Sequence, residues 1–443
     1  MPDVISAREI AAGVRGGRLD PVEVAREHLA RIVQMDGTLH AFTVVRDEAL
    51  GDAAHLAQSG LVAALPLAGV PVAVKDSFGL AGLPAGHGSR AASAAPAERD
   101  DELVRRLRAA GAIIIGKTSM PELAIWPFTE GPGWATRNPA LRSRTCGGSS
   151  GGSAVAVATG MAALAVGTDG GGSIRIPAAC CGVVGVKPTP GQVPLPGDAV
   201  DHWYGCTAAG PLARDVADAA LLLDVLRGHE PAPPPEWPQR ALRIAVSLRH
   251  PVLGAPVDER TQATIRRVAQ LLRSAGHAVH DEDPPYPRLP LRFARCYLAG
   301  IAEDAEVLSL DVGRAEARTR SMVRIGRWIR DRGWDRAASR DPAGRRLRHW
   351  IRKRDAAITP VVAYPPPPVG RWARGGWLRT GLSVDRWMGF NQPWNLAGCP
   401  AVVVPVPGDG ALRVGVQLAG PPGAERRLLE LAVQVEALAS GQG

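Results

Sequence analysis

Two segments rich in glycine and serine hold the residues best suited to chemistry. Residues 145–153 read TCGGSSGGS and residues 167–175 read GTDGGGSIR, with Ser149 in the first and Ser173 in the second. Glycine loses more conformational freedom on folding than any other residue. Such density makes sense where backbone N–H groups must crowd around a reacting atom. The two segments therefore predict a serine nucleophile surrounded by backbone donors.

Lys75 is the residue best suited to activate such a serine. Only four of the 52 Lys and Arg residues are lysines, and Lys75 lies near the end of the apolar stretch 67–76, LAGVPVAVKD. Arginine keeps its proton in proteins, whereas burial lowers the pKa of a lysine amine and lets it act as a base. The structural alternative is a salt bridge between Lys75 and a nearby acid, where arginine would serve equally well.

The stretch between the two segments must position both serines. Residues 154–161 are small, mostly apolar and free of proline, so they predict a helix, whereas glycines 170–172 cannot continue one. The predicted order is loop, buried helix, short strand, loop. This order brings two serines and several N–H groups into one small space.

Elsewhere the chain alternates between helix and strand, which is the pattern of a doubly wound α/β sheet. Proline-rich residues 231–238 form a connector, and residues 303–354 are polar, arginine-rich and mostly helical. Helices are predicted at 6–13, 21–34 with Asp20 as N-cap, 47–57, 101–110, 215–226, 258–275 and 424–437, and strands at 41–45, 67–76, 112–116, 182–186, 242–246, 277–280 and 401–405.

Composition excludes several classes of protein. The chain has 443 residues, 46% of them hydrophobic, which is enough for a large core. Its charge of +9 comes from scattered arginines without an aromatic-studded basic groove, which argues against nucleic-acid binding. The longest apolar run, 154–166, is too short for a membrane span, and no signal peptide is seen, so a cytoplasmic protein is expected. The six cysteines lack metal-ligand spacing and are expected to be free thiols, with no metal and no cofactor.

The chain resembles the amidase signature family over nearly its whole length. The diagnostic block is 147–153 with 167–177 and 182–189, and supporting blocks are 69–76, 116–122, 210–215, 395–400 and 415–420. The resemblance implies one α/β domain over 1–443, an α/β/α sandwich around a large mixed, mostly parallel twisted sheet. Within it, 1–60 form an N-terminal helical layer, 61–230 the catalytic core, and 231–443 a part with substrate-pocket loops.

The resemblance also implies a Ser–cisSer–Lys triad of Ser173, Ser149 and Lys75, with a cis peptide bond between Gly148 and Ser149. The N–H groups of Gly170, Gly171, Gly172 and Ser173 are expected to form the oxyanion hole. Ser150, Asp169 and Arg175 are expected to support the two segments. The sequence departs from the family pattern at Cys146, where proline is common, and at Gly170, where a bulkier residue often precedes two glycines.

An amide is a poor electrophile with a poor leaving group, so its hydrolysis needs an activated nucleophile, oxyanion stabilisation and a proton for nitrogen. Lys75, Ser149 and Ser173 supply the activated nucleophile and the proton through a relay, and the N–H groups of 170–173 stabilise the oxyanion. A rival pattern, the G-x-S-x-G nucleophile elbow, is met at 147–151. That motif requires a preceding strand, and residues 138–144 do not predict one, which disfavours a histidine-based triad.

The expected reaction is hydrolysis of the C–N bond of a small-molecule carboxamide to a carboxylate and ammonia or an amine, through an acyl-enzyme. The alternatives are the amidase subunit of a glutamine-dependent amidotransferase and a non-catalytic binding protein. Trp126, Phe128, Trp203 and the region 364–388 are candidates for the substrate pocket, although packing explains Trp126 and Phe128 about as well. Aryl, aliphatic, peptide-amide and lactam substrates all stay open, as do esters, and a homodimer is left open as the assembly.

Overall fold

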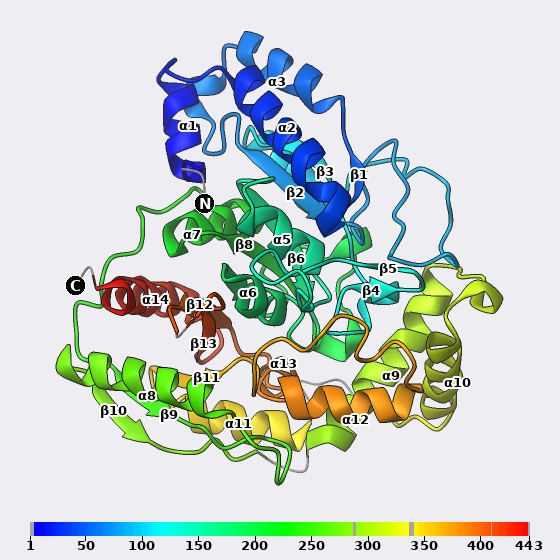
Figure 1. Ribbon diagram of the computed structural model, residues 1–443, viewed down its shortest axis with the longest axis vertical. Helices are drawn as coiled ribbons and strands as arrows, with labels where there is room; N and C mark the ends of the chain where they lie inside the picture. The colour runs from blue at the N-terminus through cyan, green and yellow to red at the C-terminus, as the bar shows by residue number, and fades with distance from the viewer. Residues whose placement is uncertain (1–3, 287–288, 336–340, 409, 442–443) are drawn as a thin grey trace.

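A single sheet of eleven strands forms the centre of the molecule (Figure 1). The computed structural model describes residues 4–286, 289–335, 341–408 and 410–441. The strands are β1 (Phe42–Val45), β2 (Pro71–Lys75), β3 (Ile113–Thr118), β6 (Leu164–Asp169), β7 (Val184–Lys187), β8 (Ala208–Ala213), β9 (Arg243–Val246), β10 (Ala278–Asp281), β11 (Ala356–Pro360), β12 (Ala401–Val406) and β13 (Val414–Ala419). Their order is β1-β3-β2-β6-β8-β7-β12-β13-β11-β9-β10, and β4 (Glu130–Gly131) and β5 (Trp134–Ala135) form a separate hairpin.

The sheet is mixed, as predicted, but it is not mostly parallel. Four pairings are parallel, namely β2–β3, β2–β6, β9–β10 and β9–β11. Six are antiparallel, among them both pairings of β8 and both of β13. A strand buried on both faces reads as an apolar run whatever its direction. The sequence therefore locates such strands without showing how they run.

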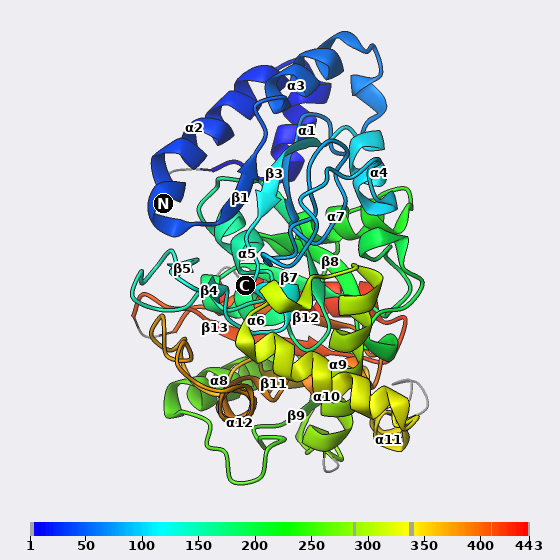
Figure 2. The ribbon, with the colours of Figure 1, turned by 90° about the vertical axis from the view of Figure 1, so that its right-hand side faces the viewer.

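Helices cover both faces of the sheet, which confirms the three-layer α/β/α prediction. The helices are α1 (Ala7–Arg15), α2 (Pro21–Leu39), α3 (Ala49–Gln58), α4 (Glu102–Ala109), α5 (Gly151–Ala158), α6 (Arg175–Cys181), α7 (Val216–Arg227), α8 (Glu259–Ser274), α9 (Leu289–Val307), α10 (Ala317–Asp331), α11 (Pro342–Ile351), α12 (Trp377–Met388), α13 (Gln392–Leu396) and α14 (Glu425–Ser440). In Figure 2, α2 lies to the left of β1 and β3 and α4 to their right.

Successive side chains of the central strands point to opposite faces of the sheet and so pack against the two helical layers in turn. Val72 and Val74 of β2 pack in one apolar cluster with α1, α4, α7, α8 and α14. Ala73, between them, packs in a second cluster with α2, α3, α5, α6 and α10. The same alternation holds in β3 and β6. Both faces of the sheet are therefore apolar, and the sheet positions residues at its strand ends rigidly.

Side chains at the helix ends explain several helix boundaries. Ser6 and Glu9 form a capping box at α1, and Asp20 accepts a hydrogen bond from the Val22 N–H at 2.9 Å, which confirms it as the N-cap of α2. α5 begins at Gly151, three residues before the predicted start, inside the first glycine-rich segment. A Cβ atom at Gly152 would lie 2.3 Å from the Ala41 carbonyl oxygen. Glycine there lets the helix start approach the neighbouring backbone.

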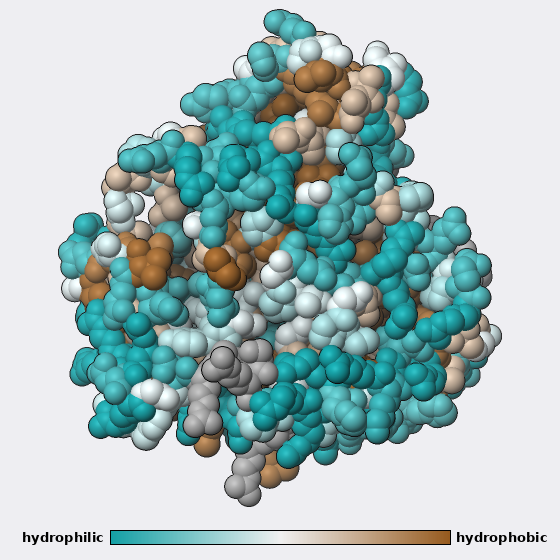
Figure 3. Space-filling model, turned by 180° about the vertical axis from the view of Figure 1, so that it is seen from behind, coloured by the Kyte–Doolittle hydropathy of each residue, from teal (hydrophilic) through white to brown (hydrophobic). Residues whose placement is uncertain are grey.

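Hydrophilic side chains cover most of the face in Figure 3, especially its lower half. All six cysteines are buried thiols that form no disulfide with one another, as predicted. No helix in the described part of the chain is long and apolar enough to cross a membrane.

Candidate active site

The ends of two neighbouring parallel strands bring Lys75, the candidate base, close to residues 167–175. These residues form the nucleophile segment, which carries the candidate nucleophile Ser173. β2 ends at Lys75, and β6 ends at Asp169. The register pairs Val74 with Val166, so the strands end at the same edge of the sheet. This edge is where α/β proteins commonly hold their ligands.

Lys75 is fully buried, and hydroxyl groups contact its amine. Its Nζ lies 2.7 Å from Ser149 Oγ and 2.8 Å from Thr168 Oγ1. No carboxylate of the described residues forms an ion pair with it, and neighbouring Asp76 pairs instead with Lys117 at 3.0 Å. The salt-bridge interpretation of Lys75 is therefore wrong.

Burial lowers the pKa of Lys75 to about 7, and the negative charge of Asp169 opposes this only in part. A substantial fraction of the amine is therefore neutral near neutral pH. A neutral amine has a lone pair that can accept the proton of Ser149 across the same short contact. The neutral Lys75 amine thus has the chemistry to act as a base without a carboxylate partner.

Ser150 links the first glycine-rich segment to the second. The peptide bond between Gly148 and Ser149 is cis, as the family resemblance predicts. The Ser150 N–H donates to the Ser173 carbonyl oxygen at 3.0 Å. Its hydroxyl donates to the Thr168 carbonyl oxygen and accepts from the Thr168 N–H, both at 3.3 Å. Ser150 therefore fixes the position of Ser149 relative to Ser173 and β6.

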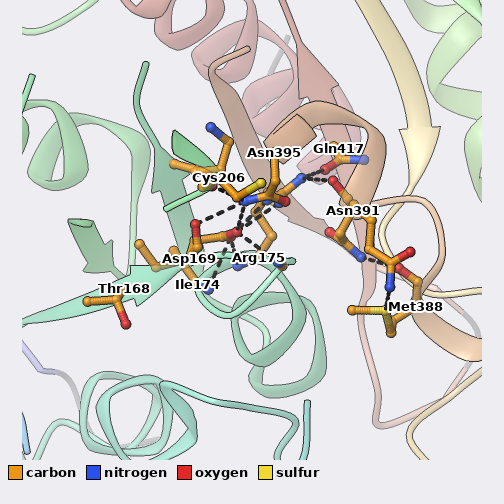
Figure 4. Close-up of polar contacts among 12 residues, drawn as sticks. Thr168, Asp169, Ile174, Arg175, Cys206, Met388, Asn391, Asn395 and Gln417 are labelled. Atoms are coloured by element: carbon orange, nitrogen blue, oxygen red, sulfur yellow. Dashed lines mark hydrogen bonds and ion pairs between the residues drawn. The ribbon is translucent and has the colours of Figure 1, made fainter. Parts of the chain in front are cut away.

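Asp169 organises the segment that carries Ser173 (Figure 4). Its carboxylate accepts hydrogen bonds from the Gly172 N–H at 2.7 Å and the Ile174 N–H at 3.2 Å. Because the Gly172 N–H is directed to this carboxylate, Gly172 is removed from the predicted oxyanion donors. The N–H groups of Gly171 and Ser173 make no hydrogen bond within the described part of the chain.

The indole ring of Trp203 explains the glycine at position 170. A Cβ atom at Gly170 would lie 2.6 Å from Cε3 of Trp203, so no side chain fits there. The departure of Gly170 from the family pattern is thus matched by a tryptophan that occupies the space. A bulkier residue at 170 would displace Trp203 from the wall of the site.

Arg175 connects the nucleophile segment to the C-terminal half of the chain. Its guanidinium is fully buried and pairs with Asp169 at 2.8 Å. It also donates to Gln417 Oε1 at 2.6 Å and to the Asn391 carbonyl oxygen at 3.2 Å, and it contacts Asn395. Burial alone would raise the pKa of Asp169, but the charge and hydrogen bonds of Arg175 hold it well below its usual range. Asp169 is therefore ionised, and its carboxylate bonds both to Arg175 and to the backbone of the segment that carries Ser173.

Replacing Arg175 with methionine is expected to lower the free energy of unfolding by about 3–5 kcal/mol, because it leaves the buried carboxylate of Asp169 uncompensated. Urea denaturation measures this loss. The matched control is Arg273→Met, which breaks the exposed pair with Asp281 and is expected to cost less than about 1 kcal/mol. Equal small losses in both variants would contradict the structural role given to Arg175.

An apolar cavity of about 210 Å³ opens in front of Ser173. Trp126 and Trp203, two of the predicted substrate contacts, line it. Phe128 is not among the lining residues. It is 1% exposed and stacks between Trp126 and Trp372, so the packing interpretation holds for Phe128.

Several residues of this site carry no clear signal in the sequence. Thr168 contacts Lys75, but a threonine one position before Asp169 does not stand out. Most of the remaining cavity wall comes from α9 and α12. The residues of α12 fall within the predicted pocket region 364–388, whereas those of α9 look like an ordinary helix face in the sequence. The apolar lining residues of these two helices are Leu291, Phe293, Ala294, Tyr297, Leu298, Trp377, Leu378, Leu382, Val384 and Met388.

Comparison with known proteins agrees with this fold. The Amidase family model matches residues 23–429. The Mycobacterium tuberculosis protein named "Putative amidase AmiB2" is 42% identical, over 95% of this chain and 93% of its own length. A Thermus thermophilus subunit of glutamyl-tRNA(Gln) amidotransferase is 34% identical, over 97% and 96%. A solved structure of 6-aminohexanoate cyclic dimer hydrolase with its substrate is 29% identical, with a TM-score of 0.85 over 99% of this chain and 98% of that one.

The chain therefore belongs to the amidase family, the amidase signature enzymes. It is an amidase, a hydrolase that acts on C–N bonds.

Proposed function

We propose that this amidase hydrolyses a small-molecule carboxamide through Ser173 as nucleophile, Ser149 as proton relay and Lys75 as base. The observation that carries the proposal is the buried Lys75 amine, which has no ion-pair partner among the described residues and lies 2.7 Å from Ser149 Oγ. A lysine held this way is costly to keep for structural reasons alone.

In the proposed reaction, Ser173 Oγ bonds to the amide carbon while its proton passes to Ser149, whose own proton passes to Lys75. The N–H groups of Gly170, Gly171 and Ser173 stabilise the oxyanion, and losing one such donor typically costs about 2.7–4 kcal/mol. The C–N bond then breaks as the proton returns through Ser149 to the leaving nitrogen. Water hydrolyses the resulting ester at Ser173 by the same relay and releases the carboxylate.

The role of an amidotransferase subunit is the weaker alternative. The relative of that name is 34% identical, against 42% for the mycobacterial amidase. Free glutamine carries an α-carboxylate that calls for a cationic partner, and the described residues lining the cavity include no lysine, arginine or histidine. An apolar cavity supports an aryl or aliphatic amide instead.

The test is intact-protein mass spectrometry after treatment with a broad fluorophosphonate probe. We expect one covalent adduct on the wild-type protein and none on Ser173→Ala, because only an activated serine reacts readily. An adduct that persists in Ser173→Ala, or no adduct on folded wild-type protein, would overturn the assignment of Ser173. A screen of amides would follow a positive result.

A further inference from the structure

The cavity in front of Ser173 has aromatic walls. Trp126, Trp203, Phe293, Tyr297 and Trp377 all line it. The faces of aromatic rings carry negative electrostatic potential and attract cations, including alkylammonium groups. Aromatic walls alone suit any apolar substrate, so a second feature is needed to distinguish a charged one.

That feature is Asp385, the single acidic residue among the described residues lining the cavity. Its Oδ1 accepts one hydrogen bond from Gln392 Nε2 at 2.8 Å. No described lysine, arginine or histidine forms an ion pair with it, in contrast to Asp169 and Asp76, which both pair with a cation. Burial raises the pKa of Asp385, which reflects the cost of holding its charge there. A carboxylate in such surroundings is poorly stabilised by the protein itself.

The geometry of α12 directs Asp385 to the cavity. Trp377, Gly381, Val384, Asp385 and Met388 all line it, and their spacing places them on one face of the helix. Gln392, the hydrogen-bond partner of Asp385, begins α13, and Asn395 of that helix donates to Asp169 Oδ1 at 2.8 Å. The carboxylate is therefore held by the same short helix that supports the nucleophile segment.

We infer that the preferred substrates are amides that carry a positively charged amine remote from the scissile bond, and that Asp385 binds this amine. The inference rests on the proposed function, because it places the amide at Ser173. The apolar and aromatic walls contact the spacer between the two groups. The ammonium gives Asp385 a charge partner, which the described residues do not provide.

The test compares para-nitroanilides of ω-amino acids with those of fatty acids in which a methyl group replaces the ammonium, over a series of chain lengths. At one of these chain lengths, kcat/KM of the wild-type enzyme is expected to be about ten- to a hundredfold higher for the amino substrate than for the methyl substrate. This is the range for a hydrogen bond to a charged group. Asp385→Asn is expected to remove this preference, so that kcat/KM for the amino substrate falls to about that for the methyl substrate of the same length. The control, Asp281→Asn at an exposed position, is expected to keep it.

Binding provides a readout that does not depend on turnover. Hexylammonium is expected to bind Ser173→Ala in calorimetry at least about tenfold more tightly than it binds Ser173→Ala/Asp385→Asn, whereas hexanol binds both alike. A fluorophosphonate adduct on Ser173 together with equal binding of hexylammonium by both variants would overturn the role of Asp385 and leave the proposed function intact. Loss of the adduct with selective binding retained would overturn the proposed function instead.

Discussion

Replacing Ser173 with alanine is expected to lower kcat/KM by about 10⁴- to 10⁶-fold, the range seen when the nucleophile of a serine hydrolase is removed. The side chain is half-buried and lines an apolar cavity, and the backbone oxygen of Ser173, which accepts from Ser150, is unaffected by the change. The fold should therefore persist. Amide turnover and the melting temperature, measured on the same preparation, separate the two effects.

The matched control for this change is Ser274→Ala, because Ser274 is exposed at the end of α8. It is expected to keep full activity and stability. Substantial turnover by Ser173→Ala would show that another group attacks the amide. The histidine-based alternative would then have to be considered again.

Replacing Lys75 with arginine is expected to lower kcat/KM by about 10³-fold or more, because a guanidinium keeps its proton and cannot act as a base. The same substitution at Lys353, which is exposed, is expected to leave activity unchanged. Appreciable activity of Lys75→Arg at neutral pH would contradict the proposed relay through Ser149.

The pH dependence of the wild-type enzyme follows from the same amine. Burial lowers the pKa of Lys75 to about 7, and only the neutral form can act as the base. The value of kcat/KM should therefore fall about tenfold per pH unit below about pH 7 and reach a plateau above it. A flat profile from pH 5 to 8 would exclude a base with this pKa.

The free energy of unfolding is also expected to increase with pH, because of the same Lys75 amine. The folded pKa of Lys75 lies below its ordinary value of 10.5, so the unfolded chain binds more protons between the two values. This group alone makes the protein more stable as pH rises from about 7 to about 10.5, and it contributes no further change below about 7.

The clustering of the candidate catalytic residues could be predicted from the sequence better than the strand directions around them. Lys75, Ser149 and Ser173 lie in segments whose composition is hard to explain without a reaction, and the order of loop, buried helix, strand and loop is confirmed by α5 and β6. The first residues of α1 and α2 were also predictable, because Ser6 and Asp20 cap these helices by local hydrogen bonds.

The strand directions, the oxyanion donors and the complete cavity wall could not be predicted, because they depend on contacts between residues distant in the sequence. The direction of β8 and β13 follows from their neighbours in the sheet, which an apolar run does not specify. The engagement of the Gly172 N–H depends on where Asp169 turns its carboxylate. The cavity wall of α9 and α12 forms only when residues near 293 and 385 meet in three dimensions.

The contacts of Arg175 have a consequence for the order in which the enzyme becomes active during synthesis. The partners that hold its guanidinium include Asn391, Asn395 and Gln417, which leave the ribosome more than two hundred residues after it. Until they arrive, the nucleophile segment contains a charged pair with several of its hydrogen bonds unmade. A nascent chain therefore contains Ser173 long before the contacts that position its segment can form. We expect hydrolytic activity to appear only when almost all of the polypeptide has been made and folded.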